Sequence, residues 1–171
     1  GDFSGYTDIA LGTSKLFGID LLKNFNYPYF SRDIAEFWRR WHISLSSWFR
    51  DYLYIPLGGS KGSRFVQIRN VFIIFLVSGF WHGANWTFII WGFLNAVYFL
   101  PLLLFNQNRV NTGNVEITCD YNGLITVFKI VFTFILTCLA WVFFRSTNVS
   151  MACTYLYNVF YKFTFTSQFL N

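Results

Sequence analysis

The dominant feature of the hydrophobic pattern is a stretch over 71–105 that contains no Asp, Glu, Lys or Arg. As a single helix it would be about 52 Å long at about 1.5 Å per residue, whereas the hydrocarbon core of a bilayer is about 30 Å thick. A break is therefore expected at Gly83-Ala84-Asn85, where turn-forming residues interrupt the apolar run. The pattern predicts a shorter helix ending near Trp81 and a longer one from about Trp86 to Leu104, with His82 at the break.

Other segments also have helical patterns. Residues 123–145 form a second apolar run that is long enough to span a membrane. Residues 31–56 predict one amphipathic helix at the membrane interface, with Ser31 as its N-cap and with arginines away from an apolar stripe. That stripe consists of Phe37, Trp41, Leu45, Trp48 and Tyr52, at spacings of three or four. Residues 3–22 and 151–162 are compatible with helices.

Composition supports a membrane protein. Hydrophobic residues make up 54% of the 171 residues and charged residues only 12%, against about 25% charged in soluble proteins. This balance excludes intrinsic disorder, which needs low hydrophobicity and high charge. The three cysteines, Cys119, Cys138 and Cys153, lack the spacing of a disulfide framework or of a metal site. The fold class predicted is all-α: a polytopic helical membrane protein with three to four membrane helices plus an interfacial helix.

The positive charge also fits a membrane protein. A net charge of +5 could suggest nucleic acid, but in so apolar a chain basic residues mark the cytoplasmic side, and no nucleic-acid partner is expected. Seven of the 13 basic residues lie between Arg32 and Arg69, so that flank is predicted to be cytoplasmic. The chain begins at Gly1 with a stretch unlike a signal peptide, and we expect it to be a piece of a longer protein.

His82 is the most conspicuous candidate for chemistry. A titratable side chain within an uncharged membrane stretch is costly, and such residues usually serve a function. Imidazole transfers protons near neutral pH, as the removal of a hydroxyl proton in acyl transfer requires. The alternative is a histidine that hydrogen-bonds a helix carbonyl, and a metal site is a weaker option because ligand spacing is missing. Asn85 could orient the ring or hold a carbonyl group, or it could cap a helix.

Two function classes remain open at this point. The nucleophile motif G-x-S-x-G is absent, so direct acyl transfer with histidine as the base fits better than a serine-hydrolase mechanism. The rival is a transport or scaffolding subunit, because broken helices at membrane depth are common in transporters.

Long motifs carry a family resemblance. The segment 37–59, FWRRWHISLSSWFRDYLYIPLGG, and the segment SGFWHGANWTFIIWG around His82 resemble the membrane-bound O-acyltransferase superfamily, in its alginate O-acetyltransferase-like branch. DFSGYTDIALG, NFNYPYFS and LAWVFFRS are similar to the same branch. A sister branch transfers D-alanine to teichoic acid, but the stretch 54–59 is closer to the polysaccharide-acetylating branch.

The resemblance implies a multi-pass enzyme of the bacterial cytoplasmic (inner) membrane. It would move an acetyl group from a thioester donor, acetyl-CoA or an acyl carrier, to hydroxyls of an extracytoplasmic polysaccharide, with no bound cofactor. Its partners would be membrane lipid, the polysaccharide acceptor and extracytoplasmic acetyltransferase proteins. Family members have several times more spans, so 1–171 would be part of one membrane domain without its N-terminal spans, and inactive alone.

The resemblance also implies roles for individual residues. His82 falls on the essential histidine of the family and His42 on a second well-known polar position, which makes both catalytic candidates. We assign Asn85, Trp81 and Trp41 to substrate binding and expect no metal site. The matched motifs also contain five charged residues, Asp2, Arg39, Arg40, Arg50 and Asp51. These residues would form structural ion pairs or contact donor phosphates, and we favour ion pairs.

Overall fold

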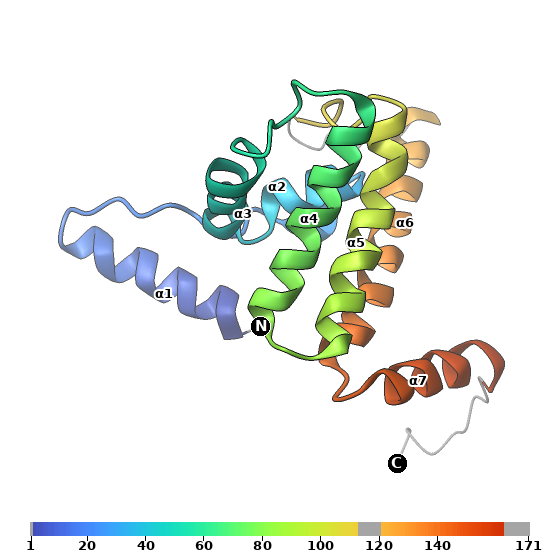
Figure 1. Ribbon diagram of the computed structural model, residues 1–171. Coiled ribbons are helices and arrows are strands. Elements are labelled where there is room, and N and C mark those ends of the chain that lie inside the picture. Colours follow the sequence, from blue (N-terminus) through green and yellow to red (C-terminus); the bar gives the residue numbers. More distant parts are fainter. Residues whose placement is uncertain (1, 113–120, 163–171) are drawn as a thin grey trace, which may run out of the picture.

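The computed structural model describes residues 2–112 and 121–162, and within those ranges the regular elements are all helical (Figure 1). In chain order they are α1 (Asp2–Leu16), the 3-10 turn η1 (Pro28–Phe30), α2 (Ile34–Arg40), α3 (Ile43–Phe49), the π-helical turn η2 (Arg50–Tyr54), α4 (Arg64–His82), α5 (Trp86–Leu104), α6 (Tyr121–Arg145) and α7 (Val149–Tyr161). The predicted all-α class is confirmed.

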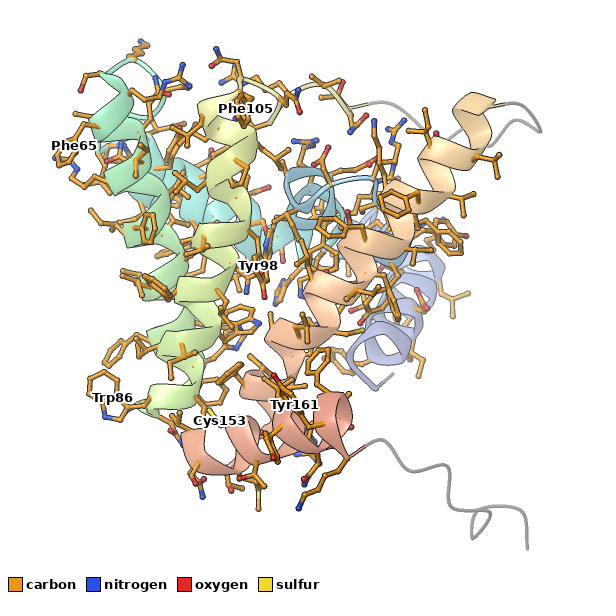
Figure 2. The ribbon with its side chains drawn as sticks, turned by 90° about the vertical axis from the view of Figure 1, so that its right-hand side faces the viewer. Phe65, Trp86, Tyr98, Phe105, Cys153 and Tyr161 are labelled. Carbon is orange, nitrogen blue, oxygen red and sulfur yellow. The ribbon has the colours of Figure 1, made fainter. Side chains whose placement is uncertain are left out.

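Three of these helices are long and apolar enough to cross a membrane: α4, α5 and residues Gly123–Arg145 of α6. They lie side by side in Figure 1, with α5 packed between α4 and α6. Figure 2 places Phe65 and Phe105 near one end of the α4–α5 hairpin and Trp86 near the other. These three rings are exposed, as expected for aromatic side chains at the two membrane interfaces.

The break in the apolar run lies at Gly83–Asn85, as the sequence predicts. However, α4 begins at Arg64, so α4 and α5 are each 19 residues long. Each is thus about 28 Å in length, enough to cross the hydrocarbon core. The break is therefore a turn between two full-length helices. His82 is the last residue of α4, and it lies near one end of the hairpin.

Close backbone contact holds the hairpin together. A Cβ built on Gly79 would overlap the carbonyl oxygen of Phe88, and one on Gly92 would overlap that of Phe75. Both glycines are buried. Small residues at such positions let two membrane helices approach at the level of their backbones.

The prediction of a single helix over 31–56 is wrong, because the region forms α2, α3 and η2. The chain leaves helical geometry at Trp41, which is extended (φ −102°, ψ 126°), and at His42, which is left-handed (φ 45°, ψ 57°). The expected stripe is therefore divided, with Phe37 buried but Trp48 and Tyr52 exposed.

The expected N-cap at Ser31 is also wrong. Asp33 caps α2 by accepting a hydrogen bond from the Glu36 amide (2.7 Å), while the Ser31 hydroxyl donates to the Pro28 carbonyl (2.6 Å). The first helix, α1, ends at Leu16, earlier than the compatible stretch 3–22, because Gly18 takes a left-handed conformation (φ 72°). Cys138 and Cys153 are unpaired thiols, and Cys119 lies outside the described residues.

Candidate active site

One pocket brings together the two histidines, which are forty residues apart in the chain. Its volume is about 140 Å³, comparable to an engineered cavity of about 150 Å³ that holds benzene. The pocket therefore has room for an acyl group and a few further atoms. Its walls are mostly aromatic and aliphatic, and it is lined by Trp38, Trp41, His42, Leu45, Ser46, Phe49, Ile74, Phe75, Ser78 and His82.

His82 reaches the pocket from the end of α4, where Gly83 terminates the helix. Aromatic rings surround its imidazole: the ring centroids of Trp81 and Phe144 lie 4.9 Å away and that of Trp91 lies 5.3 Å away. In the described part of the chain the imidazole has no hydrogen bond to a helix carbonyl, the bond that the packing alternative required. Ring contacts hold the imidazole instead, at near-perpendicular angles to the rings of Trp81, Trp91 and Phe144.

His42 reaches the same pocket from the break between α2 and α3. Burial lowers the pKa of its imidazole below the ordinary value of 6.5. A backbone hydrogen bond raises the pKa, but its effect is smaller than that of burial. Burial thus favours the neutral form of the His42 imidazole. Its neighbour Trp41 also lines the pocket and packs on Trp141, with centroids 5.1 Å apart.

Two of the predicted substrate-binding residues lie outside the lining of this pocket. The Asn85 side chain caps α5 by accepting from the Thr87 amide (3.2 Å), and its amide nitrogen donates to the Thr147 carbonyl (2.9 Å). This is the capping role that the sequence left open. Trp81 is 57% exposed, and its ring contacts that of His82 edge-on with centroids 4.9 Å apart. Of the three predicted residues, the pocket includes Trp41.

Several lining residues were missed from the sequence. Ile74 and Ser78 precede His82 by eight and four residues on α4, so helical spacing counted back from His82 could have found them. Trp38 precedes His42 by four residues within the helix expected over 31–56, so the same spacing could have found it. Its indole nitrogen is buried without a hydrogen-bond partner among the described residues, so an N–H donor lies unused in a residue that lines the pocket.

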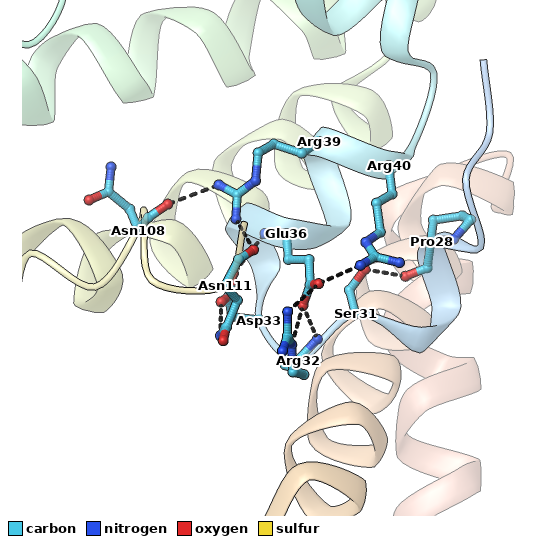
Figure 3. A network of polar contacts seen from close by, with 9 residues as sticks. All are labelled: Pro28, Ser31, Arg32, Asp33, Glu36, Arg39, Arg40, Asn108 and Asn111. Carbon is cyan, nitrogen blue, oxygen red and sulfur yellow. Dashed lines mark hydrogen bonds and ion pairs between the residues drawn. The ribbon is translucent and has the colours of Figure 1, made fainter. Parts of the chain in front are cut away.

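A buried ion cluster formed by α2 and the residues just before it was also missed (Figure 3). The Glu36 carboxylate accepts hydrogen bonds from the backbone amide and guanidinium of Arg32 (2.7, 2.9 and 3.1 Å) and from Arg40 (2.7 Å). Burial alone would raise the pKa of Glu36, but the hydrogen bonds from Arg32 and the two positive charges outweigh it, and the net pKa is lowered. Glu36 is therefore a carboxylate at neutral pH, only 1% exposed.

Four of the five charged residues of the matched motifs make structural contacts in the described part of the chain. Arg40 pairs with Glu36 and Arg50 pairs with Asp51, both at 2.7 Å, in agreement with the predicted ion pairs. Arg39 instead donates to the carbonyls of Asn108 (2.9 Å) and Asn111 (2.7 Å), as Figure 3 shows. The Asp2 side chain lies outside the described residues. Within the described ranges no three His, Cys, Asp or Glu side chains are grouped to hold a metal ion.

The chemistry available is that of imidazole in an apolar cavity. A neutral imidazole can accept the proton of a hydroxyl group, and a second one nearby can donate to an oxygen that becomes negative. Low polarity strengthens both interactions, because fewer water molecules compete for the same groups. The site is suited to reactions in which a hydroxyl attacks a carbonyl carbon.

Comparison with known proteins gives a consistent picture. A model described as the membrane-bound O-acyltransferase family matches residues 1–146. This chain is 45% identical to a probable alginate O-acetylase of Azotobacter vinelandii and 46% identical to a peptidoglycan O-acetyltransferase of Helicobacter pylori. Each alignment covers 151 residues, which is 88% of this chain. A teichoic acid D-alanyltransferase of Bacillus subtilis is 35% identical over 84% of this chain.

The chain spans 28%, 27% and 37% of the length of these three relatives. The matched region 1–146 includes both histidines, every residue that lines the pocket and the three helices able to cross a membrane. From this match, and from the identity shared with these relatives, the chain belongs to the membrane-bound O-acyltransferase family.

Proposed function

We propose that this chain carries part of the active site of a membrane-embedded O-acyltransferase. The enzyme would move an acetyl group from a thioester donor to a hydroxyl of an extracytoplasmic polysaccharide, with His82 as the base. The observation that carries the proposal is the convergence of His42 and His82 on one apolar pocket of about 140 Å³. The relatives named as O-acetylase and O-acetyltransferase support the same reaction class.

In the proposed reaction His82 accepts the proton of the acceptor hydroxyl while the hydroxyl oxygen attacks the thioester carbonyl carbon. His42, neutral because it is buried, donates a hydrogen bond to the carbonyl oxygen as that atom becomes negative. The carbon–sulfur bond then breaks and the acyl group stays on the acceptor oxygen as an ester. The sulfur leaves as a thiolate and takes the proton from His82, so the products are an ester and a thiol.

The distribution of charge suggests an orientation in the bacterial inner membrane. Arg64 begins α4, Lys61 precedes it and Arg109 follows α5 and contacts Ser60 (3.1 Å), so these three basic residues lie at one end of the hairpin, whereas His82 ends α4 at the opposite end, where Arg145 ends α6. Because basic residues favour the cytoplasmic side, the His82 end would face outward. That arrangement suits an extracytoplasmic acceptor, polysaccharide or partner acetyltransferase, with a thioester donor that enters from inside.

The rival proposal of a transport or scaffolding subunit loses its physical support. It relied on a helix broken within the membrane, whereas α4 and α5 are each long enough to cross it. No other observation favours transport over chemistry.

The test is to replace His82 by alanine and by glutamine in the full-length protein. We expect the O-acetyl content of the purified polymer to fall by a factor of about 10² to 10⁴, the usual contribution of a general base. Phe80→Leu is the matched control, because Phe80 is 64% exposed on the same helix and does not line the pocket. The membrane content of each variant is measured by immunoblotting.

Wild-type acetyl content in His82→Ala would show that the base is wrongly assigned. Reconstituted vesicles that contain a radiolabelled acetyl thioester distinguish the rival class. An acyltransferase forms labelled ester, whereas a transport subunit moves the label across the bilayer without changing its chemical form.

A further inference from the structure

The most informative contact outside the pocket is made by Asn24, in the connector between α1 and η1. Its side-chain oxygen accepts hydrogen bonds from the backbone amide (3.1 Å) and the hydroxyl (2.6 Å) of Ser44. Its backbone carbonyl accepts from the amide of Ile43 (3.0 Å). Ile43 and Ser44 are the first two residues of α3, so Asn24 satisfies two of the amides that a helix leaves without partners at its start.

This role normally belongs to the residue just before a helix, whose own side chain accepts from the first turn. For α3 that residue is His42, and its side chain makes no capping hydrogen bond. A residue eighteen positions earlier supplies the cap instead. The His42 imidazole can therefore line the pocket rather than fold over the start of α3.

The connector also holds the other side of the break. The Asn26 amide donates to the carbonyl of Arg40 (3.0 Å), the last residue of α2. Between these two attachments the ring of Phe25 packs on Trp41, with centroids 4.9 Å apart, and lies 6.3 Å from the ring of His42. The connector thus binds the end of α2 and the start of α3 together, on both sides of the two non-helical residues.

The contacts of the connector hold His42 in an uncommon backbone conformation. Its left-handed backbone (φ 45°) is uncommon for residues other than glycine, although histidine adopts it more often than most. Such conformations persist only where the surrounding structure fixes them, and they occur at functional sites. Without the cap, the low-energy alternative is a continuous helix through Trp41 and His42, which would turn the imidazole away from its present direction.

We propose that Asn24 is a positioning residue for His42. It caps α3 from the connector and so holds the Trp41–His42 break in the conformation that directs His42 toward the pocket shared with His82. The inference rests on the proposed function, because it assumes that the pocket is the site of acyl transfer.

The experiment measures kcat and KM for [14C]acetyl-CoA with the purified, reconstituted full-length protein. Asn24→Ala removes the side-chain cap, and we expect kcat per folded molecule to fall at least tenfold while KM changes less than about threefold, because geometry and not donor binding is lost. Asn24→Asp keeps an oxygen that accepts the same two bonds and should stay within about threefold of wild type. Asn26→Ala is the matched control, because only the backbone of Asn26 makes these contacts.

A second set of variants separates positioning from general damage. If Asn24 acts through His42, adding Asn24→Ala to His42→Ala should lower kcat less than about twofold further, since the two changes remove one interaction. If Asn24→Ala does not accumulate, Ser44→Ala can replace it in the same comparison with His42→Ala. Ser44→Ala removes only the hydroxyl contact with Asn24, so its effect should be smaller. Independent, multiplicative losses in the double variant would overturn the inference.

The two proposals fail in different ways. Full activity in His82→Ala contradicts the proposed function. Loss of activity in His82→Ala, together with wild-type kcat in Asn24→Ala, contradicts the positioning role alone. Equal losses in Asn24→Ala and Asn24→Asp would also overturn it, because the aspartate keeps the cap.

Discussion

Replacing Glu36 by glutamine in the full-length protein tests how strongly the segment before His42 depends on one buried carboxylate. Glu36 has a side chain that is 2% exposed and binds two arginines, Arg32 and Arg40. Glutamine has nearly the same size and keeps one acceptor oxygen. It removes the negative charge and turns an N–H donor toward a guanidinium that is itself a donor.

The expected loss can be worked from the contacts. Removing one partner of a buried ion pair costs about 3–5 kcal/mol, because the other charge is left uncompensated. Here two guanidinium groups lose their partner, but the Arg32 and Arg40 side chains keep 17% and 14% of their surface exposed, so water solvates part of the remaining charge. We expect the free energy of unfolding to fall by about 3 kcal/mol at pH 7.

The lowered pKa of Glu36 also predicts how the free energy of unfolding changes with pH. The pKa of Glu36 is lowered below its usual 4.5 in the folded protein, so the carboxylate contributes stability that is fully present above that value. The contribution is lost as the pH falls through the lower, folded-state pKa. The stability of the wild type should therefore drop more steeply than that of Glu36→Gln below about pH 4.5, and the two should converge.

The assay is tryptophan fluorescence during denaturant unfolding in detergent, repeated from pH 7 down to pH 3. Asp51→Asn is the matched control, since Arg50 and Asp51 are also 2.7 Å apart but their side chains are 61% and 46% exposed. That variant should unfold like the wild type. Equal unfolding of Glu36→Gln and wild type at pH 7, or a difference that grows in acid, would refute the reasoning.

Two further changes test the packing of the hairpin and the role of Asn85. Gly92→Ala should reduce the folded yield and cost about 1–3 kcal/mol, because the new Cβ overlaps the Phe75 carbonyl; Gly12→Ala, where a Cβ meets nothing within 4 Å, should be tolerated in the same fluorescence-detected size-exclusion assay. Asn85→Ala should lower the free energy of unfolding by about 1–2 kcal/mol through loss of the α5 cap. It should leave the donor KM unchanged, and a large rise in KM would restore Asn85 as a substrate ligand.

The helices that cross the membrane could be predicted because their signals are local. Length and hydropathy identify α5 and α6, and the Gly83-Ala84-Asn85 sequence places the turn before α5. The start of α4 was missed by seven residues, since Arg64 and Arg69 lie within the helix while the prediction began where charges end. A membrane helix can extend beyond its apolar residues, because long basic side chains near its end can place their charge at the membrane–water interface.

The break at His42 could not be predicted because its cause is not local. Phe37, Trp41 and Leu45 keep helical spacing across it, and the segment contains no glycine or proline. In the structure the start of α3 is capped by Asn24, twenty residues before Ser44, and one sequence does not show that contact. The cap of α2 was within reach, however: Asp33 followed by Glu36 has the spacing of a capping box, a stronger signal than Ser31 alone.

Each of the two histidines directly follows a tryptophan in the sequence, and the structure explains this repeated Trp-His pair. Each pair lies where a helix stops: Trp41 and His42 follow α2, and Trp81 and His82 are the final residues of α4. A side chain at a helix end is not confined between the neighbouring turns, so it can face a cavity between elements. The preceding tryptophan anchors the end by ring contacts, on Trp141 in one case and on His82 itself in the other. Because α2 and α4 both pack on α5, the two helix ends lie close enough for both imidazoles to line one pocket.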